Sequence, residues 1–281
     1  MKTMKGPLLV FHICCTIQDS QILTFVAPYV FLPSYAFLGV GLFSWMGVPP
    51  MAQFMVMFFS IYCTGAAITY LFESRASINT DNKFRFSKLR SRLIYYFTNV
   101  AFNCIISLFF VLKVPADQEE AKLEILIEMP CPTREFFTEP TYIPSDFYYT
   151  EIMILYVVPF LLLMVLAQLL FFVFLSIYYL YVRSQEITSP QTRRLQQWFF
   201  IGILIQTVIP FALMALPFAV ITVMLKFKKL TQAVTNMYFV IFGMHGMIES
   251  IAILMVHKGY RNVIFGFFKY VKPIEPHREL T

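Results

Sequence analysis

Charged residues are scarce in this 281-residue chain, because Asp, Glu, Lys and Arg together make up only 14% of it, against roughly 25% in an average soluble protein. Only two Trp and five Cys residues are present, and no CxxC, HExxH, GxGxxG or P-loop pattern occurs. Four of the cysteines lie in apolar stretches, where cysteine behaves as a small hydrophobic residue. The sequence therefore does not indicate a disulfide framework, a nucleotide-binding loop or a zinc hydrolase.

Hydrophobic residues are abundant instead, at 58% of the chain, with 32 Phe and 16 Tyr. A soluble domain of this length cannot bury so much apolar surface, and a disordered chain contains far less of it. We therefore predict an all-α membrane protein with several spanning helices. The net charge of +6 is interpreted as basic residues that flank the membrane spans, and no nucleic-acid partner is expected.

Six segments are long and apolar enough for a helix that crosses a hydrocarbon core of about 30 Å. They are residues 7–31, 51–71, 93–112, 152–179, 198–224 and 234–256. We predict a single transmembrane bundle over residues 1–281, with an outer loop at 113–150 and a cytoplasmic tail at 257–281. Residues 33–48 are uncharged and rich in Pro and Gly, which predicts an outer loop with Trp45 at the membrane interface.

The distribution of basic residues predicts the orientation of these spans. Sixteen Lys and Arg residues lie on one side and six on the other, so the side with sixteen is cytoplasmic and both termini are inside. The acidic loop at 113–150 has the length of a lid over the bundle or of a solvated loop without a specific role. A cleaved signal peptide is a competing interpretation of the N-terminus, although no small-residue cleavage site follows the apolar run.

Four ionisable residues fall inside predicted spans, where a charge is costly and usually serves a function. His12 and Asp19 are two helical turns apart and share one face, and His245 and Glu249 are one turn apart and share another. We predict that both faces point into the bundle and form a polar network that rearranges on activation; a static network is the alternative. Because only two histidines are intramembrane, no metal site, cofactor or enzymatic activity is predicted.

Short patterns at the ends of the predicted spans carry a family resemblance. They are Met4-Lys5, Pro28-Tyr29-Val30-Phe31-Leu32-Pro33, Gly47-Val48-Pro49, Phe72-Glu73-Ser74-Arg75, Pro130-Cys131-Pro132, Gln191-Thr192-Arg193-Arg194-Leu195-Gln196 and His257-Lys258-Gly259-Tyr260-Arg261. In this order, over nearly the whole chain, they resemble the nematode serpentine chemoreceptors of class H, which are seven-span G-protein-coupled receptors. Met4-Lys5 resembles the start of the family's second span. The chain is therefore interpreted as a six-span form with the family's helices two to seven.

The resemblance implies a receptor-like bundle in the plasma membrane, the sensory cilium included, that detects a small-molecule odorant and signals to a heterotrimeric G protein. It also implies that Glu73 and Arg75 lie where such receptors lock the inactive state and contact the G protein. Residues two apart on a helix do not face each other, so we expect Glu73 to pair with Arg193 or Arg194 from another helix.

Two further features have alternative explanations. Pro210 and Pro217 each remove a backbone hydrogen bond, which predicts a pivot in span 198–224 or packing without motion. The basic residues Lys83, Arg85, Lys88, Arg90 and Arg92 are assigned to membrane lipid headgroups, with a G-protein contact as the second choice.

The functional interpretation leaves several points open. Cys131 occupies the outer-loop position that is disulfide-bonded in many receptors of the wider superfamily, but no cysteine lies between Phe31 and Ser60. A non-signalling membrane remnant of a receptor and a small-solute transporter or channel are the alternatives to a signalling receptor. No ligand-binding residue is indicated by the sequence.

Overall fold

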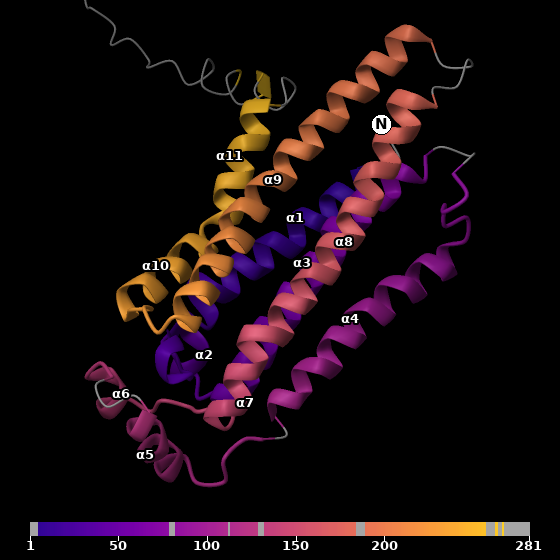
Figure 1. Ribbon diagram of the computed structural model, residues 1–281. Helices are drawn as coiled ribbons and strands as arrows, with labels where there is room; N and C mark the ends of the chain where they lie inside the picture. Colours follow the sequence, from indigo (N-terminus) through magenta and orange to yellow (C-terminus); the bar gives the residue numbers. More distant parts are fainter. Residues whose placement is uncertain are drawn as a thin grey trace, which may run out of the picture.

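The computed structural model describes residues 5–78, 82–111, 113–128, 132–183 and 189–256, together with residues 262, 263 and 266. Most of this part of the chain is helical, which confirms the predicted all-α membrane fold (Figure 1). Five helices in the described ranges are long and apolar enough to cross a membrane. They cover Gly6–Phe25, Pro50–Ala76, Leu89–Phe109, Phe147–Val182 and Gln191–Lys226.

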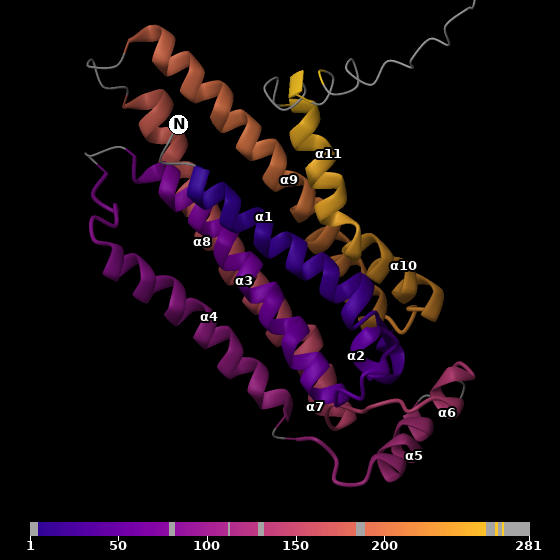
Figure 2. The same ribbon diagram turned by 180° about the vertical axis from the view of Figure 1, so that it is seen from behind.

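The bundle is assembled around helix α3. In chain order its long helices are α1 (Lys5–Ser20), α3 (Pro50–Ala76), α4 (Leu89–Val111), α8 (Val158–Ile177) and α9 (Pro190–Lys226). Helix α3 contacts α1, α4 and α8, and both views show it between α1 and α4 (Figure 2). Phe11 from α1, Phe72 from α3 and Phe200 from α9 meet in the main core, each at most 1% exposed. This core joins α1, α3, α8 and α9 near the end expected to be cytoplasmic, called the inner end below.

Short segments extend two of the long helices. Helix α1 continues as η2 (Gln21–Phe25), and the helix around α8 consists of α7 (Phe147–Ile152), η4 (Met153–Val157), α8 and η5 (Tyr178–Val182). Side-chain oxygens cap the first turns of several helices: Asp146 accepts a hydrogen bond from the Tyr149 N–H at the start of α7, and Ser189 accepts one from the Thr192 N–H at the start of α9. These contacts satisfy backbone donors that the first helical turn leaves unpaired.

The predicted first span, residues 7–31, ends earlier than expected, at Phe25. Ala27 has a positive φ of 43°, and Pro28 has no backbone N–H, so the helix cannot continue through them. The chain turns instead into an antiparallel hairpin of β1 (Pro28–Phe31) and β2 (Ala36–Gly39), which sequence analysis interpreted as span and loop. The 3-10 turn η3 (Leu32–Ser34) joins the strands, and α2 (Leu42–Trp45) follows them.

The predicted last span, residues 234–256, consists of two short helices, α10 (Gln232–Gly243) and α11 (His245–Val256). Each has 12 residues, or about 18 Å at 1.5 Å per residue, which is too short to cross the hydrocarbon core alone. The break falls at Met244, whose φ of −90° and ψ of −4° depart from α-helical values. Five long spanning helices are therefore found in the described chain, where the sequence predicted six.

The predicted outer loop at 113–150 also contains regular structure. Helices α5 (Gln118–Glu128) and α6 (Glu135–Thr138) pack on the hairpin, and Phe31, Ile125, Phe136 and Ile143 form a small core, each at most 2% exposed. We call residues 28–39, 118–128 and 132–143 together the outer cap. Cys131 and its disulfide question lie outside the described residues.

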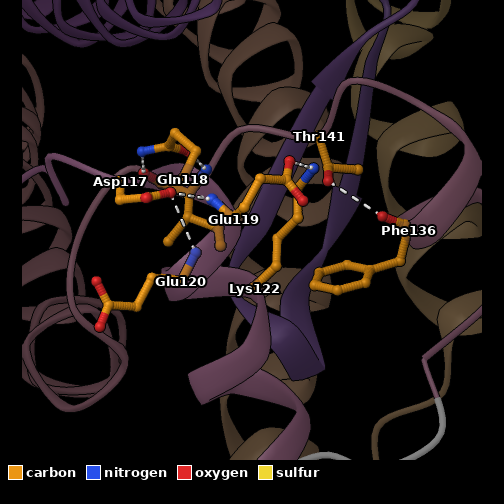
Figure 3. A network of polar contacts seen from close by, with 8 residues as sticks. Asp117, Gln118, Glu119, Glu120, Lys122, Phe136 and Thr141 are labelled. Atoms are coloured by element: carbon orange, nitrogen blue, oxygen red, sulfur yellow. Dashed lines mark hydrogen bonds and ion pairs between the residues drawn. The ribbon is translucent and has the colours of Figure 1, made fainter.

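Polar contacts hold the outer cap together (Figure 3). The Asp117 carboxylate accepts hydrogen bonds from the backbone N–H groups of Glu119 and Glu120, at 2.9 and 3.2 Å, and so begins helix α5. The Gln118 side chain binds both backbone groups of Ile143, accepting from its N–H at 2.8 Å and donating to its carbonyl at 3.3 Å. Burial raises the pKa of the nearby Tyr142 phenol above its ordinary value. The cap is thus a folded unit rather than an irregular loop.

Candidate functional site

The four predicted intramembrane residues lie together where α1 passes α11. His245 Nδ1 is 2.9 Å from Asp19 Oδ1, and His12 Nδ1 is 3.5 Å from Glu249 Oε1. We call these four residues the intramembrane cluster. Its two histidine–carboxylate pairs form because the two helices cross with the polar face of each turned toward the other. The sequence spacing on both helices predicts this meeting, whereas the role of the cluster in activation stays a prediction.

Burial differs across the intramembrane cluster. His245 and Glu249 are at most 1% exposed, whereas the Asp19 and His12 side chains are 19% and 30% exposed. His245 Nδ1 also lies 2.7 Å from the Phe242 carbonyl oxygen. Both oxygens near Nδ1 are acceptors, so this nitrogen carries a hydrogen. The imidazole therefore links α11 both to α1 and to the last turn of α10.

Glycine residues allow α1 to approach the break between α10 and α11. A Cβ atom at Gly246 would overlap Asp19 Oδ2, and one at Gly243 would overlap the Leu23 side chain. Small residues at such crossings let membrane helices pack closely. No group of three or more His, Cys, Asp and Glu side chains within the described ranges has the arrangement of a metal site. The close crossing brings the histidines and carboxylates of the two helices within pairing distance.

A second polar group lies at the inner end of α3, around Glu73, which is fully buried. Arg92 from α4 binds both carboxylate oxygens, with Nε 2.9 Å from Oε2 and Nη2 3.0 Å from Oε1. The Ser77 hydroxyl donates to Oε1 at 2.5 Å, and the Arg92 guanidinium lies 5.7 Å from the centre of the Tyr70 ring. We call Glu73, Ser77 and Arg92 the inner ion pair.

The predicted pairing of Glu73 with Arg193 or Arg194 is wrong, because Arg92 binds its carboxylate. Arg193 donates instead to the Tyr181 carbonyl at 3.2 Å, and Arg194 is exposed, with no ion pair in the described part of the chain. Helix α4 follows α3 in the chain, and its first turn lies next to Glu73 at the end of α3. Arg92, which sequence analysis assigned to lipid headgroups, faces inward for this reason.

Arg75 connects α3 to another helix, as expected for a residue on a different face from Glu73. Its Nη2 donates to the Gln196 carbonyl of α9 at 3.4 Å, and the residue is only 9% exposed. Arg193 in turn connects α9 to the last turn of η5. The inner end of α9 is therefore held by two arginines, one from α3 and one of its own.

The predicted pivot residues Pro210 and Pro217 lie within one uninterrupted helix, α9, which runs for 37 residues. No break in the helical assignment occurs at either proline. Their role as a pivot stays a prediction.

A polar network between α4 and α8 escaped the sequence analysis. The Gln168 side-chain oxygen accepts hydrogen bonds from the Tyr95 hydroxyl and the Asn99 amide, each at 2.7 Å. The Asn103 amide donates to the Asn99 carbonyl at 2.7 Å. The spacing of four residues between polar positions on α4 was the available signal, because it places them on one face. These contacts attach α8 to the outlying helix α4.

Comparisons with known proteins agree with the bundle and with the span-end patterns. The chain matches the family described as serpentine type 7TM GPCR chemoreceptor Srh over residues 1–270. It is similar to serpentine receptor class H-72 of Caenorhabditis elegans, with 32% identity over 272 residues, which cover 95% of this chain and 76% of that protein. No solved structure gives a significant match. Both similarities extend over nearly the whole chain, and the family match includes each helix described above.

Proposed function

Because the chain belongs to the family of serpentine class H chemoreceptors, we propose that this multi-pass membrane protein binds an external small molecule and signals to a heterotrimeric G protein. The observation that carries the proposal is the contact of Arg75 with α9. This contact joins α3 to the inner end of a helix that extends to the opposite end of the bundle (Figure 1).

The proposed mechanism has two packings of the bundle. In the packing described here, Arg75 holds the inner end of α9 against α3, and the inner ion pair holds α4 against α3. A ligand shifts the balance only if it binds the second packing more tightly. In that second packing the inner end of α9 moves away from α3, and a surface for the G protein opens. The intramembrane cluster keeps α1 and α11 together, and Pro210 and Pro217 are the proposed pivot of α9.

The proposal predicts that loss of the Arg75 contact raises ligand-independent signalling. We would compare Arg75→Ala with the wild type in cells, using resonance energy transfer to follow dissociation of a panel of tagged Gα subunits from Gβγ. No odorant is needed, because removing a contact of the resting packing shifts the equilibrium directly. A lost hydrogen bond from a charged donor, worth about 1.5–3 kcal/mol, corresponds to an increase of about tenfold or more in the ratio of active to resting receptor.

Arg194→Ala is the matched control, since Arg194 is an exposed arginine near the same helix end. All signals are divided by surface expression, measured with a terminal tag. Equal basal signalling by Arg75→Ala, Arg194→Ala and the wild type at equal expression would contradict the proposed switch. An ion flux that is unaffected by G-protein inhibitors would favour a channel or transporter instead.

A further inference from the structure

The loop that joins α3 to α4 presents an exposed basic surface. Of the five basic residues between positions 83 and 92, only Arg92 is paired with a carboxylate in the described chain. The remaining four are exposed: Lys83, Arg85, Lys88 and Arg90. We call these four residues the basic segment. Their charges are not neutralised by any carboxylate within the described ranges.

The backbone of this loop is held in place. Asn82 is 5% exposed, its side-chain amide donates to the Ala76 carbonyl at 3.0 Å, and its side-chain oxygen accepts from the Phe84 N–H at 2.9 Å. Phe86 packs on the main core, with its ring 5.2 Å from that of Tyr95. The loop is therefore anchored from inside, and its four cations are displayed on a structured turn.

Apolar side chains alternate with the exposed cations. Phe84 is 59% exposed and Leu89 is 67% exposed, although both stand beside basic residues at the end of a spanning helix. Alternating cations and exposed apolar groups fit the boundary between lipid headgroups and acyl chains. A protein partner would need a complementary acidic surface of its own, whereas the bilayer lies beside this loop in every state of the bundle.

We propose that the basic segment binds the phosphates of anionic phospholipids in the inner leaflet, with Phe84 and Leu89 inserted at the headgroup level. Polybasic stretches next to a spanning helix are attracted to anionic leaflets through the charge of each Lys or Arg. The lipid would bind the first turn of α4 on its exposed side, while Arg92 binds Glu73 on the buried side. The proposal does not depend on whether the chain couples to a G protein.

The test measures lipid binding to the purified full chain in a neutral detergent. The anionic probe is a short-chain phosphatidylinositol bisphosphate, and the neutral probe is a short-chain phosphatidylcholine. Each lipid is titrated, and its binding is followed by native mass spectrometry. The segment variant carries Lys83→Gln, Arg85→Gln, Lys88→Gln and Arg90→Gln. The control variant carries Lys113→Gln, Lys226→Gln, Lys228→Gln and Lys229→Gln, four exposed lysines from the opposite end of the bundle.

We expect the wild type and the control variant to bind the anionic probe alike, and the segment variant to bind it at least about tenfold more weakly. Added salt should weaken wild-type binding, and the neutral probe should not discriminate among the three proteins. A charge-preserving variant in which each Lys becomes Arg and each Arg becomes Lys should retain binding. Thermal unfolding checks that every variant is folded. If the segment variant is not folded, the double variant Lys88→Gln with Arg90→Gln replaces it, and a smaller loss of affinity for the anionic probe is expected.

Three outcomes would overturn the proposal. The first is anionic-lipid binding by the segment variant that equals that of the wild type. The second is unchanged lipid binding combined with a loss of G-protein coupling in the segment variant, which would assign the surface to a protein partner. A loss of equal size in both variants would show a general effect of net charge and would also exclude a site in this loop.

Discussion

Replacement of Arg92 by Met should strongly destabilise the bundle, because it leaves a buried carboxylate without its counter-ion. Glu73 is 0% exposed and Arg92 is 22% exposed, and two of the three polar contacts to the Glu73 carboxylate come from Arg92. Breaking such a pair by removal of one partner costs about 3–5 kcal/mol. For a chain of this size, that loss lowers the unfolding midpoint by roughly 5–9 °C.

The double variant Glu73→Gln with Arg92→Met sharpens this prediction. It removes both charges, so no uncompensated charge stays buried, and we expect it to be more stable than Arg92→Met alone. Arg90→Met is the matched control, because Arg90 is exposed and unpaired among the described residues. Thermal unfolding of purified protein in detergent, followed by intrinsic fluorescence, measures all four proteins. A midpoint for Arg92→Met equal to that of Arg90→Met would falsify the assignment of the inner ion pair.

Two further substitutions test the helix contacts. Gly246→Ala should separate α1 from α11 and lower thermal stability, because the new methyl group overlaps the Asp19 carboxylate, whereas Gly65→Ala meets only ordinary contacts and should be tolerated; equal midpoints would contradict the close crossing. Gln168→Leu should cost about 1–3 kcal/mol, because two donors of α4 lose their acceptor; a stability unchanged in the same unfolding assay would mean that this network does not hold α4.

Hydropathy and periodicity predict much of the bundle. A membrane helix makes its backbone hydrogen bonds within itself, so a long apolar run is enough to indicate it. Helix α3 contains the predicted span 51–71, and α9 contains the predicted span 198–224. The meeting of His12 and Asp19 with the α11 residues follows from the same logic. Each pair shares a helix face, and polar faces in a membrane turn toward one another.

The features that were missed depend on contacts between distant residues. The hairpin strands β1 and β2 show no alternation of polar and apolar residues, because β2 is buried throughout within the outer cap. The predicted partner of Glu73 was wrong because the packing of the helices decides which of several arginines lies beside the carboxylate, and the sequence does not show that packing. The break at Met244 has no proline beside it, and it lies between Gly243 and Gly246, which pack closely against Leu23 and Asp19.

The outer cap also fastens the outer ends of several helices to one another. It ties the segment after α1 to the segment before α7, and the Gln232 amide at the start of α10 donates to the Val30 carbonyl of β1 at 2.9 Å. The outer end of α9 is joined to this same region through the turn before α10. A helix of 37 residues is roughly 55 Å long at about 1.5 Å per residue. With its outer end anchored there, a tilt of α9 by about 5° would carry its inner end through roughly 5 Å, about one helical turn.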